Sequence, residues 1–421
     1  MTLILNKDNK GDIKKFYDEI LNKMVDLKFT NNDISTPIDC VEDMINKIPE
    51  DFWKNPDNKI LDPCCGCGNF PVILFYKLIK YHSKEHILDN MLYFNDINEV
   101  RLNVLKDVFN YDGLNVTMTD FMKLKYNFKF NLIVANPPFA KIDLDTGKRA
   151  SKNHNLIGSF IYKSLECLTE GGFLLYITPD NWMSYAIRNT LIRILTGLQI
   201  VYINIHQAKK YFKKIGSSFV WYLIENRPSY KCIEIDGVWN KKNYSSVVNS
   251  EVRNYIPLYY TKEIQSILNK TIDKDNKKFN IQTSSDLHRY TKASFLNTEK
   301  TDVYKFRIIH TPSQTVWSSR PHKYQDGYKV YIPITTYYEP FVETDGMTQS
   351  MMFIICESEK NAIKNCAILK HPLYRFINNI CRYGNFNNIQ ILQKMPLCDD
   401  HEKVYDYFNI TNDEKKIIEM K

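Results

Sequence analysis

The chain has 421 residues, enough for two domains at roughly 100–200 residues per domain. Lys and Arg number 56 against 48 Asp and Glu, and the resulting net charge of +8 permits an anionic partner without requiring one. No run approaches the ~18 consecutive apolar residues of a membrane span, and the N-terminus lacks the apolar core of a signal peptide, so we expect a cytoplasmic protein that does not bind membranes.

The ten cysteines are scattered along the chain without paired spacings. This distribution is typical of reduced thiols inside a cell rather than of a disulfide framework. Cys64, Cys65 and Cys67 crowd together, but no second Cys or His pair lies at the spacing of a zinc finger or ribbon. We therefore expect no metal site.

Two helices are expected before the first strand. Apolar residues recur at helical spacing over residues 11–27, which predicts an amphipathic helix that ends before the polar segment 31–37. Thr36-Pro37 suits the start of a second helix, because Pro is well tolerated in the first helical turn. Pro49 ends this second helix.

Strands and helices then alternate along the chain. We place strands at residues 59–62, 91–95, 116–118, 131–135, 173–177, 201–205 and 219–224, and helices at residues 71–81, 98–109 and 155–168. This alternation predicts an α/β domain with a doubly wound sheet. The pattern changes at residues 226–228, where we place the boundary between domains 1–227 and 228–421.

A glycine-containing turn joins the first of these strands to its helix. The turn, residues 62–70 with the sequence DPCCGCGNF, has glycines at positions 66 and 68. Glycines between a strand and a helix allow a ligand to approach the backbone closely. The Lys and Ser/Thr of a P-loop are absent, as is the full dinucleotide spacing of glycines, which disfavours kinase and dehydrogenase functions.

Acidic residues follow the second and third strands. Asp96 suits a carboxylate that accepts from ribose hydroxyls, although a helix cap would also account for it. Asp120 could accept from an adenine amino group while Phe121 lines the ring face. The alternative for this second pair is a turn residue followed by a core phenylalanine.

The most specific segment is Asn136-Pro137-Pro138-Phe139, which follows the fourth strand at the edge where open α/β sheets place their ligand crevice. The two prolines fix the backbone and remove two N–H donors. The side-chain carbonyl of Asn136 and the main-chain carbonyl of Pro137 can then both accept from one planar amino group. Phe139 can stack on a base extruded from a duplex, or it can fill the sheet edge as a core residue.

Taken in order, Thr36-Pro37, DPCCGCGNF, NDIN, TDF and ANPPF resemble the gamma class of amino methyltransferases that act on DNA adenine in restriction-modification systems. The resemblance spans residues 31–226. It implies a Rossmann-like fold that binds S-adenosylmethionine, and an enzyme that methylates the N6 amino group of a flipped-out adenine. The two acceptors would localise the lone pair of the amine toward the sulfonium methyl without an acid or base side chain.

The resemblance also implies which residues bind S-adenosylmethionine: Thr36, Asp62, Cys64, Gly66, Gly68, Asp96, Ile97, Asp120 and Phe121. Among them, Thr36 would approach the methionine carboxylate and Asp96 would take the ribose. Asp120 and Phe121 would hold the cofactor adenine, with Ile97 on its face.

For the target base, the resemblance implies a second aromatic residue opposite Phe139. Phe212 aligns best with this position, and Tyr211 is the alternative. One departure from the family pattern lies in the glycine turn, where Cys64 and Cys65 replace the usual small residues. It leaves the cofactor assignment intact.

Residues 228–421 resemble the target-recognition domain of restriction-modification adenine methyltransferases, for which we expect an α+β fold. Base edges are read by Arg, Lys, Asn and Gln side chains. The candidates are Arg320, Lys323, Gln349, Arg382 and Asn385, each of which could instead be an ordinary solvated residue. Lys152, in the polar loop after Phe139, could contact phosphates or belong to an ordinary exposed loop.

The same type of tetrapeptide occurs in enzymes that methylate guanine N2 in ribosomal RNA and glutamine in release factors, because these targets also present a planar amino group. The Thr-Pro segment and a C-terminal domain large enough to bind a duplex favour double-stranded DNA as the partner. An inactive DNA-binding module is a further alternative, against which the intact Asp96, Asp120 and Asn136 argue. We expect a monomer in a bacterial or virus-infected cell. A separate restriction endonuclease could act as its partner.

Overall fold

The computed structural model describes residues 4–20, 34–139, 156–185, 189–212, 218–335, 339–382, 384 and 386–420. The chain forms two compact units. The N-terminal unit comprises Met1–Trp182 and Leu191–Arg253, and the C-terminal unit comprises Met183–Thr190 and Asn254–Lys421. Within the described ranges, every helix is too short or too polar to span a lipid bilayer.

A nine-stranded sheet organises the N-terminal unit, with the strand order β3-β2-β1-β4-β5-β7-β6-β8-β9. The strands are β1 Ile60–Asp62, β2 Leu92–Asn95, β3 Asn115–Thr117, β4 Phe130–Ala135, β5 Leu168–Pro179, β6 Leu198–Ile205, β7 Phe219–Pro228, β8 Ile233–Trp239 and β9 Lys242–Val248. The first five are parallel, whereas β7 is antiparallel to both of its neighbours, β5 and β6. This sheet confirms the doubly wound α/β class predicted from the sequence.

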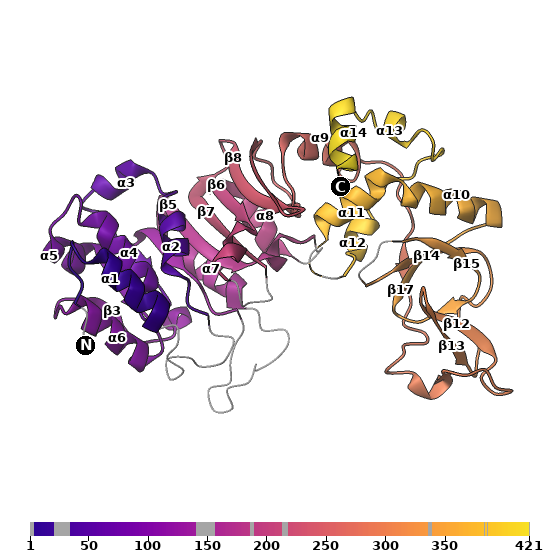
Figure 1. Ribbon diagram of the computed structural model, residues 1–421, viewed down its shortest axis with the longest axis horizontal. Coiled ribbons are helices and arrows are strands. Elements are labelled where there is room, and N and C mark those ends of the chain that lie inside the picture. The colour runs from indigo at the N-terminus through magenta and orange to yellow at the C-terminus, as the bar shows by residue number, and fades with distance from the viewer. Residues whose placement is uncertain are drawn as a thin grey trace. The chain divides into compact units, whose positions relative to one another are not determined.

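Helices cover the sheet of this unit (Figure 1). They are α1 Lys10–Lys15, η1 Phe16–Ile20, α2 Ile38–Ile45, α3 Glu50–Lys54, α4 Asn69–Leu78, α5 Lys84–His86, η4 Ile87–Met91, α6 Glu99–Phe109, η5 Phe121–Lys123, α7 Leu156–Cys167, η6 Asp180–Met183, α8 Thr190–Gly197 and η7 Gln207–Lys210. The helix predicted over residues 11–27 begins at Lys10 and is described as far as Ile20; residues 21–33 lie outside the described ranges.

One buried apolar cluster joins these helices to the sheet. It includes Ile13 of α1, Val41 of α2, Leu74 of α4, Leu105 of α6 and Leu132 of β4. Strand β4 lies between β1 and β5, and its last four residues are completely buried. A parallel strand covered on both faces requires an unbroken apolar run, which accounts for the sequence that precedes the Asn-Pro-Pro-Phe segment.

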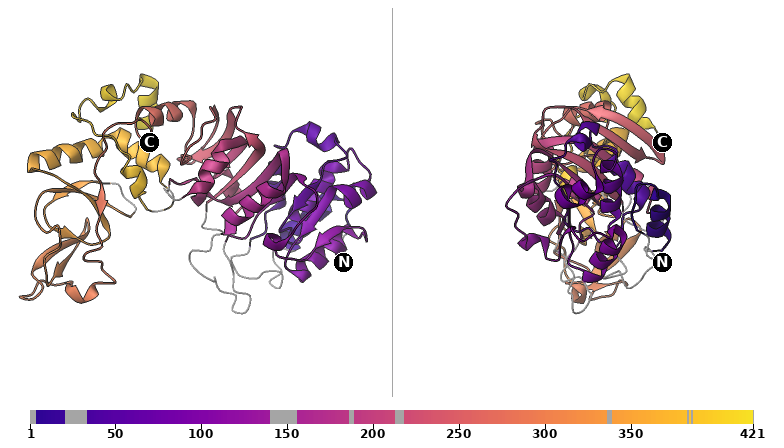
Figure 2. Two further views of the ribbon diagram at one scale, coloured as in Figure 1. Left: turned by 180° about the vertical axis from the view of Figure 1, so that it is seen from behind. Right: turned by 90° about the vertical axis from the view of Figure 1, so that its left-hand side faces the viewer.

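The C-terminal unit has an α+β architecture with two four-stranded sheets. One sheet has the order β10-β17-β14-β15 and the other has the order β11-β13-β12-β16. The strands are β10 Gln282–Thr283, β11 Leu296–Asn297, β12 Phe306–Thr311, β13 Gln314–Ser318, β14 Lys329–Pro333, β15 Phe341–Glu343, β16 Gly346–Met347 and β17 Met351–Ile355. The helices are α9 Lys262–Lys270, η8 Ala293–Phe295, α10 Glu359–Lys370, α11 Pro372–Cys381, α12 Ile389–Leu392, α13 Val404–Tyr407 and α14 Asn412–Glu419. Figures 1 and 2 show most of these helices, coloured orange to yellow, gathered at one end of the two sheets.

The boundary between the units lies at Arg253, not at Arg227 as the sequence suggested. Strand β8 pairs in parallel with β6, and β9 pairs with β8, so this hairpin extends the sheet of the N-terminal unit. The change in composition near Pro228 marks the end of β7 rather than the end of the domain.

Gly68, the residue before α4, is closely packed against its neighbours. Its φ is +103°, and an added Cβ would lie 3.0 Å from Leu105 Cδ1 and 3.1 Å from the Tyr17 hydroxyl oxygen. We expect Gly68→Ala to lower the free energy of unfolding by about 1–3 kcal/mol, because the new side chain meets both an unfavourable backbone conformation and two neighbours. Urea unfolding measures the change.

Gly158→Ala provides the matched control. Gly158 lies in α7, and an added Cβ there would meet open space. Alanine should raise the stability by about 0.5–1 kcal/mol, since it is the better helix former. Equal effects of the two substitutions would refute the packing role of Gly68.

Candidate active site

Three polar residues follow strands whose carboxyl ends meet at one edge of the sheet. Asp62 ends β1, Asp96 follows β2 and Asn136 follows β4. Strand β1 pairs in parallel with both β2 and β4, so the three residues come from adjacent strands. An open α/β sheet places its ligand crevice outside such an edge. The fold thus brings together the glycine turn, the carboxylate after the second strand and the Asn-Pro-Pro-Phe segment.

Backbone hydrogen bonds hold the Asp96 carboxylate against the glycine turn. One oxygen accepts from the Gly66 N–H at 2.9 Å, and the other accepts from the Asn98 N–H at 2.9 Å. Asn98 itself caps α6, because its side chain accepts from the Arg101 N–H. The glycine turn and the start of α6 therefore fix the orientation of the Asp96 carboxylate. The sequence left open that Asp96 caps the helix after β2, but in the structure Asn98 caps this helix.

Asp62 is buried beneath the same turn, where its carboxylate accepts from the Cys64 N–H at 3.2 Å. Burial raises the pKa of the Asp62 carboxyl well above its usual value, the hydrogen bond from Cys64 opposes this rise, and the negative charge of Asp96 adds to it. A positive group beside the two carboxylates would favour their charged forms. The turn is therefore suited to a cationic ligand.

The two glycines of the turn have different surroundings. Gly66 has a φ of +55°, and an added Cβ there would meet open space. Gly68 packs against α6 and η1, as described above, and the Tyr17 hydroxyl of η1 donates to the neighbouring Cys67 carbonyl at 2.7 Å. Of the two predicted cofactor-binding glycines, Gly66 borders open space and Gly68 supports helix packing.

The Asn136 side chain is held in one orientation by the segment before α2. Its Nδ2 donates to the Thr36 Oγ1 at 3.0 Å and to the Ile34 carbonyl at 3.1 Å. A carbonyl oxygen can only accept, so the amide nitrogen must face Ile34. The amide oxygen of Asn136 consequently points away from these two anchors.

The neighbours of Asn136 complete the strand terminus. Pro137 is buried and Pro138 is exposed. The Cys64 thiol lies 3.6 Å from the main-chain oxygen of Asn136, so the glycine turn also contacts the backbone of this segment. In the described residues, no group of three or more His, Cys, Asp and Glu side chains is arranged to hold a metal ion.

Three aromatic rings pack beside this segment. The Phe219 ring centroid lies 5.9 Å from that of Phe139 and 4.7 Å from that of Phe212. Phe139 remains half-buried, whereas Phe212 is only 3% exposed. Phe212, which was predicted to cover the target base, is therefore a core residue in this structure, and its ring packs against that of Phe219. The rival residue Tyr211 donates its hydroxyl to Asp43 of α2.

The residues predicted to surround the cofactor adenine differ in exposure. Ile97, after β2, is 52% exposed, which is high for an isoleucine and leaves its side chain available to a ligand. Asp120 is exposed and caps η5 by accepting from the Met122 N–H at 3.0 Å. Phe121 is buried and packs on Phe160 of α7 with ring centroids 5.4 Å apart. For Phe121, the structure favours the core alternative.

Sequence reasoning gave no role to Asn69, the first residue of α4. Its side-chain Nδ2 donates to the Thr36 carbonyl at 2.8 Å in a buried contact. Asn69 thereby connects the end of the glycine turn to the segment that holds Asn136. The glycine turn marked this position in the sequence, but no local pattern could reveal a partner 33 residues away.

Arg320 of the C-terminal unit is tied into the structure of that unit. Its guanidinium forms an ion pair with Asp286, with Nη2 2.8 Å from Oδ1, and lies over the Phe295 ring. The hydrogen bond from Arg320 holds the pKa of the Asp286 carboxyl below its usual value. Lys323 gives only its backbone N–H to Asp286, and its exposed ammonium lies 4.6 Å from the centroid of the Tyr324 ring. Lys323 is thus the more available cation of this pair.

The structure describes two of the four other residues that were predicted to contact DNA, Gln349 and Arg382. Gln349 accepts from the Arg289 N–H at 2.8 Å and so supports the adjoining loop. Arg382 is half-buried at the end of α11. Asn385 and Lys152 lie outside the described residues.

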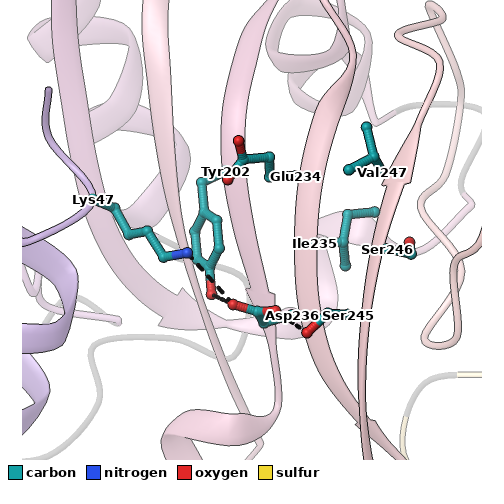
Figure 3. Close-up of a pocket in the computed structure, with 8 residues that line it drawn as sticks. All are labelled: Lys47, Tyr202, Glu234, Ile235, Asp236, Ser245, Ser246 and Val247. Atoms are coloured by element: carbon teal, nitrogen blue, oxygen red, sulfur yellow. Dashed lines mark hydrogen bonds and ion pairs between the residues drawn. The ribbon is translucent and has the colours of Figure 1, made fainter.

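A pocket of about 250 Å³ lies elsewhere on the sheet of the N-terminal unit (Figure 3). Its wall includes Lys47, Tyr202 and Asp236, from the α2–α3 connection, β6 and β8. The Lys47 ammonium lies 3.5 Å from the Asp236 carboxylate, which also accepts from the hydroxyls of Tyr202 and Ser245. These polar groups pair with one another, and those on strands lie near the middle of the strands rather than at the carboxyl ends. The sheet edge at Asn136 is therefore the better candidate site.

Comparison with known proteins finds a family model and several relatives that are similar to this chain. Residues 12–212 match the model of the Eco57I restriction-modification methylase family. The type II methyltransferase M.VspI of Vibrio sp. is 25% identical over 213 residues, which are 47% of this chain and 48% of that protein. An uncharacterised adenine-specific methylase of Mycoplasma pneumoniae is 22% identical over 379 residues, with 65% of this chain and 88% of that protein covered. The chain spans about half the length of the Vibrio relative.

Solved structures share the fold at low sequence identity. The type ISP restriction-modification enzyme LlaGI, as a nuclease-deletion mutant, has a TM-score of 0.59 and 11% identity over 98% of this chain and 56% of that chain. The type IIL restriction-modification enzyme MmeI has a TM-score of 0.52 and 10% identity over 83% of this chain and 64% of that chain. The predicted Rossmann-like fold is confirmed, and residues 12–212 of this chain are similar to the Eco57I restriction-modification methylase family.

Proposed function

We propose that this chain is a site-specific DNA adenine N6-methyltransferase, which transfers a methyl group from S-adenosylmethionine to an adenine flipped out of duplex DNA. The observation that carries the proposal is the fixed orientation of the Asn136 amide at the carboxyl end of β4. The family match supports a restriction-modification methylase. The name of the Mycoplasma relative, an adenine-specific methylase, supports adenine as the base.

The residues at this edge fit S-adenosylmethionine. The cofactor carries a sulfonium and an ammonium group, and the neighbouring carboxylates of Asp62 and Asp96 favour a cation. A carboxylate has about four lone-pair positions, so Asp96 can accept from ribose hydroxyls as well as from Gly66 and Asn98. When bound, the cofactor supplies an electrophilic methyl group on sulfur.

Asn136 and Pro137 recognise and activate the target amine. The Asn136 Oδ1 and the Pro137 main-chain carbonyl each accept one hydrogen of the amino group. An exocyclic amine conjugated with its ring is a poor nucleophile, and two acceptors that draw its hydrogens out of the ring plane localise its lone pair. The positive charge that develops on nitrogen is stabilised by the same oxygens, which are already oriented before the reaction.

The prolines and Phe139 complete the base site. Neither Pro137 nor Pro138 has an N–H, so no backbone donor competes with the amine for the acceptors. Phe139 is half-buried beside the strand terminus, and its ring stacks on one face of the flipped base. The C-terminal unit, with exposed cations such as Lys323, binds the duplex and selects the site.

The substrate assignment has a direct test. Unmethylated duplex DNA incubated with the chain and tritiated S-adenosylmethionine should yield label in N6-methyladenine after digestion to nucleosides. The two acceptors recognise any planar amine, so ribosomal RNA and release-factor protein are assayed in parallel. Label only in guanine N2 of RNA, or only in protein, would falsify the DNA assignment.

Asn136→Ala tests the proposed catalytic acceptor. Loss of one preoriented group that stabilises developing charge costs about 10²–10³-fold in kcat, so methyl transfer should fall at least that far. Binding of S-adenosylmethionine, measured by equilibrium dialysis, should survive. Asn243→Ala on the exposed strand β9 is the matched control and should retain activity. Full transfer by Asn136→Ala would remove this residue from the mechanism.

Duplex binding should depend steeply on salt, because each neutralised phosphate contact contributes about −0.9 to the slope of log K against log salt. Lys323→Gln should reduce the magnitude of the slope by about one. Lys54→Gln on α3, where the lysine is already paired with Asp51, is the control and should leave the slope unchanged. Binding of the unaltered chain that does not respond to salt would contradict phosphate contacts.

A further inference from the structure

The Asn136 amide can act as an acceptor in only one of its two orientations. With Nδ2 toward the 34–36 segment, Oδ1 is available to the substrate amine. Rotation of the amide by half a turn would present the NH2 group to the substrate and bring two donors together. The activity of Asn136 in the proposed function therefore depends on whatever prevents this rotation.

The Ile34 carbonyl prevents it, and the Thr36 hydroxyl adds a second hydrogen bond that stabilises the resulting orientation. The Ile34 carbonyl accepts at 3.1 Å and cannot donate, so a rotated amide would place two oxygens against each other. The Thr36 hydroxyl accepts at 3.0 Å and is the only side-chain group among these two contacts. Thr36 is 3% exposed, so water has little access to replace its hydroxyl.

Thr36 is itself held from the glycine turn. Its main-chain carbonyl accepts from Asn69 Nδ2 at 2.8 Å, in a contact that is buried at both ends. Asn69 is the first residue of α4, directly after Gly68. The glycine turn thereby fixes the backbone of Thr36, and the Thr36 side chain contacts Asn136.

We infer that Thr36 is a positioning residue for methyl transfer: its hydroxyl holds the Asn136 amide in the orientation that the Ile34 carbonyl selects, and Asn69 anchors Thr36 to the glycine turn. This role differs from the contact with the methionine carboxylate that the family resemblance implies for Thr36. It rests on the proposed function, because it concerns the acceptor that the substrate amine meets. A residue that acts through Asn136 affects the rate of transfer at saturation rather than the affinity for the cofactor.

The test compares Thr36→Val, which keeps the shape and removes the hydroxyl, with Thr36→Ser, which keeps the hydroxyl. Thr36→Val should lower kcat about five-fold, the effect of one neutral hydrogen bond, because the Ile34 contact remains. Its dissociation constant for S-adenosylmethionine, measured by equilibrium dialysis, should match that of the unaltered chain. Thr36→Ser should restore kcat.

Thr196→Val is the matched control. Thr196 is also 3% exposed, and its hydroxyl donates to the Ile192 carbonyl at 2.8 Å and accepts from the Arg253 N–H at 3.1 Å. It lies in α8, with no part in the proposed site. This variant should lose stability but keep kcat, which separates a loss of buried hydrogen bonds from a loss of positioning.

The outcomes separate this inference from the proposed function. If the unaltered chain methylates DNA adenine and Thr36→Val does so at the same kcat, only the positioning role fails. A weaker affinity of Thr36→Val for S-adenosylmethionine at unchanged kcat would assign the hydroxyl to the cofactor and would also overturn the inference. A Thr36→Ser variant with a kcat as low as that of Thr36→Val would overturn it as well. Absence of transfer by the unaltered chain to DNA, RNA and protein would overturn both.

Discussion

The arrangement of the site depends on the hydrogen bonds that hold Asn136 at the carboxyl end of β4. An amide offers a donor at one end and an acceptor at the other, and only the surrounding structure decides which end meets a ligand. Here the segment before α2 takes the donor end through Thr36 and Ile34. The sheet provides the matching constraint, because the parallel pairing of β1 with β2 and β4 aligns the three strand ends that carry the polar residues.

The same edge carries an electrostatic cost that a ligand can relieve. Asp62 is buried close to Asp96, and burial together with the neighbouring charge disfavours its ionised form. The hydrogen bond from the Cys64 N–H only partly offsets this cost. A glycine at position 66 leaves the space above the turn open. A cationic cofactor therefore suits both the charge and the shape of the turn.

The sequence predicted the parts of this site that local chemistry determines. The apolar run of β4 followed by two prolines, and the glycine turn between β1 and α4, have signatures within a few residues of each other. The boundary at Arg253 and the burial of Phe212 escaped prediction because both depend on pairing between distant segments: β8 with β6, and Phe212 with Phe219. The contact from Asn69 to Thr36 was missed for the same reason.

The C-terminal unit shows why the identity of a residue does not establish that it reads DNA. Arginine is the side chain best suited to guanine, yet Arg320 directs its guanidinium to Asp286 within the unit. A lysine offers less geometric specificity, but the exposed ammonium of Lys323 can reach a phosphate without first breaking an ion pair. Phosphate contacts position a protein on DNA, and base contacts specify the sequence. Selection of a particular sequence by this unit would therefore require Arg320 to exchange Asp286 for a base, or other side chains to supply the base contacts.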